Sequence, residues 1–188
     1  MSRHLLFDRP CPQCGHGLFI SSDPCRRCGR GFSMRLDDHD SLVLMAEGRS
    51  DREIGARFGK GASSGSRQVA RVLSLTGATS RAQAVDLGCR TGLLDPPDLR
   101  DQADRVRARD LDAMQLVAGG ATLGEAAQRL RSPLQPASLR QWLGTFYQAI
   151  GAGGAAPRAR AVYLLHGMRL LRPWHPCRCW HSGSKAGW

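Results

Sequence analysis

The sequence predicts a mainly α-helical protein that begins with a small cysteine-rich module. Two C-x2-C pairs lie within the first 28 residues. Behind them, apolar residues recur at helical spacing and are interrupted by Gly and Ser, which indicates several short helices and no strands. Residues 117–130 resemble the stretch that starts at Met45, which predicts that one helical unit occurs twice in the chain.

The N-terminal module is predicted to bind one structural zinc ion. Its candidate ligands are Cys11, Cys14, Cys25 and Cys28, in the pattern C-x2-C-x10-C-x2-C with a glycine after each pair. Zinc binds four thiolates as a tetrahedron, and a C-x-x-C turn places two sulfurs on one side of the ion. Residues 18–20 are expected to form a short strand between the pairs, as in a zinc ribbon. Because the module has few apolar residues, we expect it to need the metal in order to fold.

Other interpretations of the cysteines remain open. One C-x-x-C pair could cycle between dithiol and disulfide, although the βαβ setting of thioredoxin-like proteins is not indicated. His16 could replace one cysteine as a ligand, although the spacing does not favour it. A catalytic zinc needs an open coordination position, which four thiolates do not leave. Cys89 lies alone in a helical pattern and is expected to be a small buried hydrophobe.

Residues 38–94 are expected to form four short helices, because capping residues precede apolar runs and glycines follow them. The expected caps and ends, in chain order, are Asp40 or Ser41 to Gly48, Ser50 to Gly59, about Ser64 to Gly77, and Ser80 onward.

Residues 45–59 (MAEGRSDREIGARFG) resemble the LuxR-type helix-turn-helix domain. Residues 80–85 (SRAQAV) look like the opening of that family's fourth helix, and residues 91–94 (TGLL) look like its usual ending. The sequence departs from the family at Lys60 and Gly65, where members carry buried aliphatic residues. The resemblance implies that the third helix enters the major groove of DNA and that units pair through their fourth helices.

A second, diverged copy of this unit is predicted further along the chain. Residues 117–130 (VAGGATLGEAAQRL) align with the first unit from Met45 onward, and residues 158–162 (RARAV) echo residues 81–85. The apolar positions of a third helix recur at Leu139, Leu143, Phe146 and Ile150. The expected fold is therefore a zinc ribbon followed by two four-helix helix-turn-helix units.

Composition breaks divide the chain into four expected parts. Two prolines, Pro96 and Pro97, cannot continue the fourth helix of the first unit. Asp98 is then expected to cap a charged helix over residues 99–109. The expected parts are 1–34 for the zinc ribbon, 35–95 for the first unit, 96–172 for the second unit, and 173–188 for a basic flexible tail.

The tail lacks periodicity, and its cationic side chains are expected to add unspecific attraction to phosphates. Cys177 and Cys179, with His175 and His181, could instead ligate a second metal, although C-x-C spacing suits a tetrahedral site poorly.

A net charge of +11 and a pI near 10.3 favour a polyanionic partner, and double-stranded DNA is the leading candidate. The alternative is a genome composition that favours Arg, Ala and Gly. We expect a cytoplasmic, nucleoid-associated protein without a membrane partner, because neither a spanning apolar segment nor a secretory signal is present in the sequence. We do not expect an enzyme, since no phosphate loop, acidic metal cluster or nucleophile–base pair appears.

The LuxR resemblance implies that exposed residues of the third helices contact bases. Arg can pair with guanine and Gln with adenine, whereas each arginine could also be a solvated charge or contact a phosphate. Aromatic residues of the second unit, Trp142, Phe146 and Tyr147, are expected in the core rather than stacked on bases. The implied DNA-contacting residues are Ser66, Arg67, Ala70 and Arg71 in the first unit, and Arg140, Gln141, Gly144 and Thr145 in the second.

These features predict a bacterial DNA-binding transcriptional regulator, as a pseudo-dimer within one chain or as a homodimer, whose zinc ribbon is structural or docks a partner. The alternative is an adaptor that docks on RNA polymerase or another nucleoprotein complex without reading bases. The departures at Lys60 and Gly65 keep this alternative open.

Overall fold

The structure, a computed structural model, describes residues 4–5, 9–10, 18–19, 34–130 and 134–171. Four short strands form two antiparallel pairs: β1 (His4–Leu5) with β4 (Met34–Arg35), and β2 (Arg9–Pro10) with β3 (Leu18–Phe19). β3 lies within the strand predicted at residues 18–20. The pairing of β1 with β4 brings residues 4–5 next to the strand that precedes the first helix.

The described residues form two sets of four α-helices, so the expectation of a mainly α-helical chain is confirmed. A short 3-10 helix, η1 (Arg100–Arg105), lies between the sets. The first set is α1 (Leu36–Ala46), α2 (Asp51–Arg57), α3 (Ala62–Thr76) and α4 (Arg81–Thr91). The second set is α5 (Ala108–Ala118), α6 (Leu123–Arg129), α7 (Pro136–Ala149) and α8 (Pro157–Gly167).

The two sets share local structure at equivalent places. A glycine with positive φ follows the first helix of each set, Gly48 at 78° and Gly120 at 91°. A capping box then begins the second helix, with Ser50 and Glu53 in one set and with Thr122 and Glu125 in the other. In each box the glutamate carboxylate accepts a hydrogen bond from the backbone N–H of the cap residue, and this bond lowers the pKa of the glutamate. The stretches that are similar in sequence therefore also have the same local conformation.

Other predicted boundaries follow the same local chemistry. The Ser80 hydroxyl accepts a hydrogen bond from the backbone N–H of Gln83 and caps α4, as predicted. Gly77, with a φ of 68°, ends α3 where the sequence places its end. Gly59 follows α2 with a φ of 66°, also as expected.

The predicted cap of the first helix is wrong. α1 begins at Leu36, directly after β4, and neither Asp40 nor Ser41 caps it. Ser41 is fully buried inside the helix, where its hydroxyl donates to the Asp37 carbonyl at 2.7 Å. Because this hydroxyl hydrogen-bonds to a carbonyl of its own helix, it does not cap the start of a helix.

The helix predicted over residues 99–109 is also wrong. Its residues form η1, and α5 starts only at Ala108 after the extended residue Val106. The backbone N–H of Leu99 donates to the Gly167 carbonyl at the end of α8, at 3.1 Å. This tertiary contact replaces the local helix that the charge pattern predicts.

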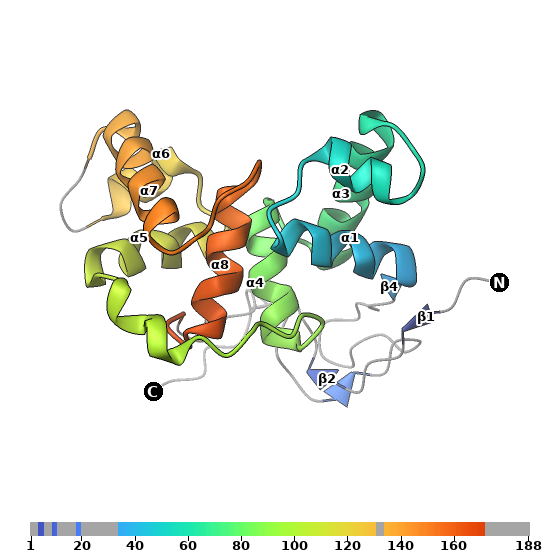
Figure 1. Ribbon diagram of the computed structural model, residues 1–188, viewed down its shortest axis with the longest axis horizontal. Coiled ribbons are helices and arrows are strands. Elements are labelled where there is room, and N and C mark those ends of the chain that lie inside the picture. Colours follow the sequence, from blue (N-terminus) through green and yellow to red (C-terminus); the bar gives the residue numbers. More distant parts are fainter. Residues whose placement is uncertain (1–3, 6–8, 11–17, 20–33, 131–133, 172–188) are drawn as a thin grey trace, which may run out of the picture.

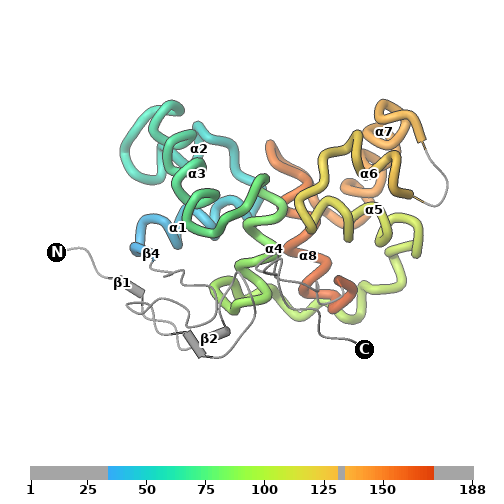
Figure 2. Tube along the Cα trace, turned by 180° about the vertical axis from the view of Figure 1, so that it is seen from behind, coloured from blue at the N-terminus to red at the C-terminus, as the bar shows by residue number. Residues whose placement is uncertain are grey.

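α4 and α8 lie side by side at the centre of the molecule, with α1–α3 on one side and α5–α7 on the other (Figure 1 and Figure 2). Fully buried side chains come from both sets, including Leu42 and Val85 in the first and Met114 and Leu165 in the second. They belong to one continuous hydrophobic core. The central helix pair therefore fixes how the two sets are placed relative to each other.

Candidate nucleic-acid interface

The position of α3 depends on a close approach to α2. A Cβ atom placed on Gly65 would lie 1.8 Å from the backbone carbonyl oxygen of Asp51, and one on Gly55 would lie 2.3 Å from that of Gly61. No side chain can be accommodated at either distance, so the two glycines allow the backbones of α2 and α3 to touch. Gly65 departs from the aliphatic residue of the LuxR pattern, and here it serves this close packing.

The residues predicted to contact DNA lie mostly on the surface. Ser66, Arg67, Ala70 and Arg71 of α3 are exposed, as are Arg140, Gln141 and Thr145 of α7, whereas Gly144 is half-buried. Neither α3 nor α7 contains an acidic residue. The two helices therefore add no negative charge of their own to these surfaces.

Two of the predicted residues on α3 are engaged by carboxylates of their own set. The Ser66 hydroxyl donates to Asp51 at 2.6 Å, and Arg71 Nε donates to Asp38 at 3.0 Å. The side chain of Asp38 is almost fully buried, so this ion pair orients Arg71 along α3. Arg67 makes no hydrogen bond or ion pair with another described residue.

The corresponding surface of α7 is unengaged. Arg140, Gln141 and Thr145 make no hydrogen bond or ion pair within the described part of the chain. On another side of the helix, the guanidinium of Arg109 stacks over the half-buried Trp142 ring at 4.4 Å. The second unit therefore has the more available polar surface.

Of the three aromatic residues of α7 predicted in the core, two are buried, whereas Trp142 is only half-buried. Phe146 and Tyr147 are both buried, and their ring centroids are 5.9 Å apart. Burial raises the pKa of Tyr147 well above its usual range, and its hydroxyl has no hydrogen-bond partner among the described residues. These rings are therefore not available to stack on bases.

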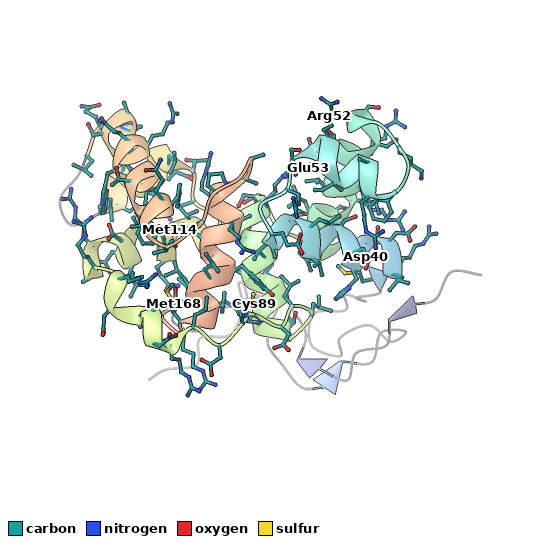
Figure 3. The ribbon with its side chains drawn as sticks, viewed as in Figure 1. Asp40, Arg52, Glu53, Cys89, Met114 and Met168 are labelled. Atoms are coloured by element: carbon teal, nitrogen blue, oxygen red, sulfur yellow. The ribbon has the colours of Figure 1, made fainter. Side chains whose placement is uncertain are left out.

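The contact between α4 and α8 includes buried polar groups. Asp86 Oδ1 lies 2.8 Å from Nε2 of His166, and Asp86 Oδ2 accepts from Arg90 at 2.7 Å. Cys89 is half-buried on the same helix (Figure 3), and burial raises its pKa to about 12. Its thiol therefore stays protonated at neutral pH, and the residue is only half-buried where the sequence predicts a buried one.

Reciprocal hydrogen bonds join the sets beside this helix pair. The backbone N–H of Ala156, before α8, donates to the carbonyl of Gly48, after α1, at 3.0 Å. In the other direction, Gln83 of α4 donates to the carbonyl of Gly119, after α5, at 3.3 Å, and Thr79 donates to Gly120 at 3.4 Å. Each set thus contacts the other through equivalent segments, as in a two-fold interface.

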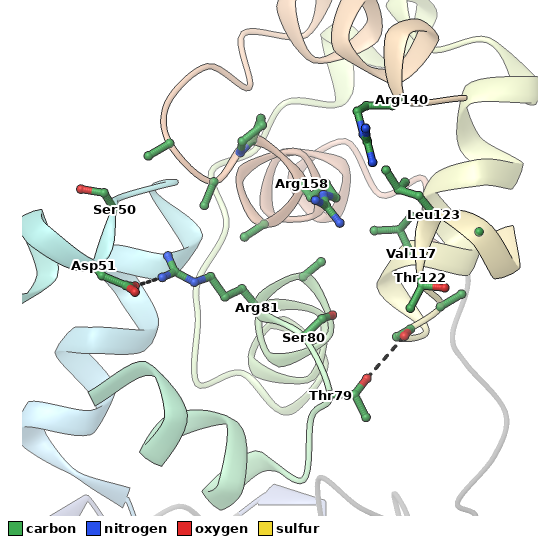
Figure 4. Close-up of a pocket in the computed structure, with 18 of the residues that line it drawn as sticks. Ser50, Asp51, Thr79, Ser80, Arg81, Val117, Thr122, Leu123, Arg140 and Arg158 are labelled. Atoms are coloured by element: carbon green, nitrogen blue, oxygen red, sulfur yellow. Dashed lines mark hydrogen bonds and ion pairs between the residues drawn. The ribbon is translucent and has the colours of Figure 1, made fainter. Parts of the chain in front are cut away.

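A groove of about 950 Å³ lies between the two sets (Figure 4). Its lining includes the first residues of α2, α4, α6 and α8 together with Arg140 of α7. Four arginines line it, Arg52, Arg81, Arg140 and Arg158, against a single carboxylate, Asp51. The sequence gives no direct sign of this groove, because its residues come from segments far apart in the chain.

The predicted zinc ligands Cys11, Cys14, Cys25 and Cys28 lie outside the described residues, as do Cys177 and Cys179 of the tail. Within the described residues, no group of three His, Cys, Asp or Glu side chains is placed to hold a metal ion.

None of the helices in the described part of the chain combines the length and apolar character required to span a bilayer. No family model, curated protein or solved structure matches the chain.

Proposed function

We propose that the protein binds double-stranded DNA, with α2–α3 and α6–α7 each acting as a helix-turn-helix. The observation that carries this proposal is the pair of exposed, acid-free surfaces on α3 and α7, which lie on either side of an arginine-lined groove. In helix-turn-helix proteins the second helix of the motif enters the major groove, while nearby backbone and basic groups contact phosphates. A chain with a net charge of +11 is suited to such a polyanion.

The central helix pair supports an arrangement in which one chain occupies two half-sites. α4 and α8 hold the two sets in a relation similar to that of a symmetric dimer, so a single chain presents both α3 and α7. In this proposal Gln141 of α7 reads bases, Arg140 beside it contacts the DNA backbone, and Arg67 of α3 adds a contact in the other half-site. The protein is then a transcriptional regulator associated with the nucleoid.

We further propose that Cys11, Cys14, Cys25 and Cys28 hold one structural zinc ion. The antiparallel pairing of β2 and β3 supports this, because the chain between these strands, residues 11–17, contains the first C-x2-C pair. A zinc knuckle is commonly carried in the turn of such a hairpin. Bound by four thiolates, the ion would cross-link the module without taking part in a reaction.

The second candidate function is that of an adaptor on RNA polymerase or another nucleoprotein complex. The observation that favours it is the engagement of Ser66 by Asp51 and of Arg71 by Asp38, which leaves the first unit fewer groups for bases. In that case the exposed helices would contact protein or unspecific phosphate.

A salt-titrated binding assay with random and genomic duplexes separates the two functions. DNA binding predicts measurable affinity for random duplex at low salt, a steep loss of affinity with salt, and selective enrichment of some genomic fragments. If zinc-loaded protein binds no duplex at low salt, the first function is excluded. Binding without any enrichment would favour the adaptor.

A further inference from the structure

In the first set of helices, one carboxylate joins the starts of three helices. Asp51, the first residue of α2, accepts a hydrogen bond from the Ser66 hydroxyl of α3 at 2.6 Å and forms an ion pair with Arg81, the first residue of α4. Arg81 also donates to the backbone carbonyl of Arg49 at 2.9 Å. The guanidinium of Arg81 is therefore neutralised and held within its own set.

The second set has different residues at the three equivalent positions. Leu123 opens α6 directly after the Thr122 capping box, as Asp51 opens α2 after the Ser50 box. Arg140 is the fifth residue of α7, as Ser66 is of α3. Arg158 begins the R-A-x-A-V segment of α8, as Arg81 begins that of α4. These two helices end in the same way, because Gly92 and Arg169 follow them with φ of 67° and 57°.

In the second set, therefore, an arginine replaces the serine hydroxyl and a leucine replaces the aspartate carboxylate. The arginine at the third position is kept. Arg140 and Arg158 make no hydrogen bond or ion pair with any residue that the structure describes. Both line the groove and extend toward the space beside Leu123 from different helices (Figure 4). Two guanidinium groups that share a groove repel each other, and an anion bound between them offsets this repulsion.

We propose that a phosphate group binds between Arg140 and Arg158, at the place where the first set holds its own Asp51 carboxylate. Guanidinium groups donate paired N–H groups that match the oxygens of a phosphate. A duplex that contacts both α3 and α7 would cross the groove and supply such a phosphate from its backbone. This source rests on the proposed function, whereas a free phosphorylated compound would offer the same chemistry without DNA.

Leu123→Asp tests the site, because it gives the second set the carboxylate that Asp51 gives the first. The variant should fold, since Leu123 is only half-buried and an acidic residue in the first turn of a helix is favourable. The new carboxylate should pair with Arg140 and Arg158 and displace the phosphate. Leu123→Asn is the matched control, because it removes the same leucine and adds no charge.

The readout is the set of arginine Nε–H signals in nuclear magnetic resonance spectra of the full zinc-loaded chain. Signals of Arg140 and Arg158 are assigned from their loss in Arg140→Lys and Arg158→Lys. We expect inorganic pyrophosphate to shift both signals in the unmodified chain and in Leu123→Asn, but not in Leu123→Asp. With a random-sequence duplex, Leu123→Asp should lower the affinity about tenfold and reduce the salt slope by about 1.

The outcomes separate this site from the proposed function. If pyrophosphate shifts both signals but no duplex binds, the phosphate site stands, its source is a free compound, and the DNA-binding function fails. Should a duplex bind while neither probe moves the two signals, DNA binding stands and this site is overturned. Equal behaviour of Leu123→Asp and Leu123→Asn would overturn it as well.

Discussion

Nε2 of His166 in α8 lies 2.8 Å from the carboxylate of Asp86 in α4, and the two residues are separated by eighty positions in the chain. Only 4% of the Asp86 side chain is exposed, and its other oxygen accepts from Arg90 at 2.7 Å. α4 and α8 join the two sets of helices. This contact therefore contributes to the spacing between the surfaces of α3 and α7.

We expect Asp86→Ala to destabilise the protein by about 3 kcal/mol. The substitution removes the buried carboxylate and leaves His166 and Arg90 without this partner. Urea unfolding followed by circular dichroism gives the free energy. The control is Asp98→Ala, which removes an ion pair to Arg100 whose side chains are both more than half exposed. That variant should unfold at the same urea concentration as the unmodified chain, and an equal loss in both would contradict the assigned role of Asp86.

Two Gly→Ala substitutions should have opposite effects. Gly65→Ala should destabilise by about 2 kcal/mol, because its Cβ would overlap the Asp51 carbonyl and force α2 and α3 apart. Gly144→Ala should stabilise by up to about 1 kcal/mol, since the new Cβ would meet no atom within 4 Å outside its own stretch of helix backbone, and alanine favours the helix. Thermal unfolding measures both. A gain at Gly65 would mean that α2 and α3 do not touch.

Local capping chemistry is what the sequence predicts well. Ser50 and Ser80 begin helices and Gly77 ends one, because side-chain oxygens and positive-φ glycines act within a few residues of chain. The start of α1 and the helix expected at residues 99–109 are wrong because distant partners decide them. β1 pairs with the strand before α1, and Gly167 binds the backbone of Leu99.

The candidate site was predictable only in part. The resemblance to the LuxR-type domain predicted that Arg140 and Gln141 are exposed, and both are. It could not show that Asp51 holds both Ser66 and Arg81, because hydrogen bonds between residues so far apart have no signal in a single sequence. The difference between Asp51 and Leu123 becomes meaningful only when the two sets of helices are compared in space.

Cys89 should make the protein less stable at alkaline pH. Its pKa is raised from 9.0 to about 12 in the folded chain, so above pH 9 the unfolded thiol loses its proton while the folded thiol keeps it. The contribution of the Cys89 thiol to the free energy of unfolding is therefore fully present below pH 9. It falls by up to about 1.4 kcal/mol per pH unit as the pH rises toward 12. Cys89→Ala should remove this part of the decline. Parallel stability–pH curves for the two proteins between pH 9 and 11 would contradict the burial of the thiol.

One zinc ion per chain is expected in native mass spectrometry of the purified protein, and Cys25→Ser should lower its retention because three thiolates bind zinc less tightly. The helices of both sets should remain, since their core comes from residues 34–171. Circular dichroism of the variant should show unchanged helix content. A chain that is metal-free as purified and after zinc addition would exclude the site, and loss of helicity in the variant would show that the module supports the helical core.

Replacing both Arg140 and Gln141 by Ala should remove sequence preference at the half-site contacted by α7. Each bidentate contact with a base discriminates by about 1 to 3 kcal/mol, so selection from a random duplex library should lose information at those base pairs. The loss of one charge should also reduce the salt slope by about 1. Arg105→Ala is the charge-matched control, because Arg105 is exposed on η1 and does not line the groove. If the double variant selects the same sequences as the unmodified chain, base recognition must come from α3 or from outside the two units.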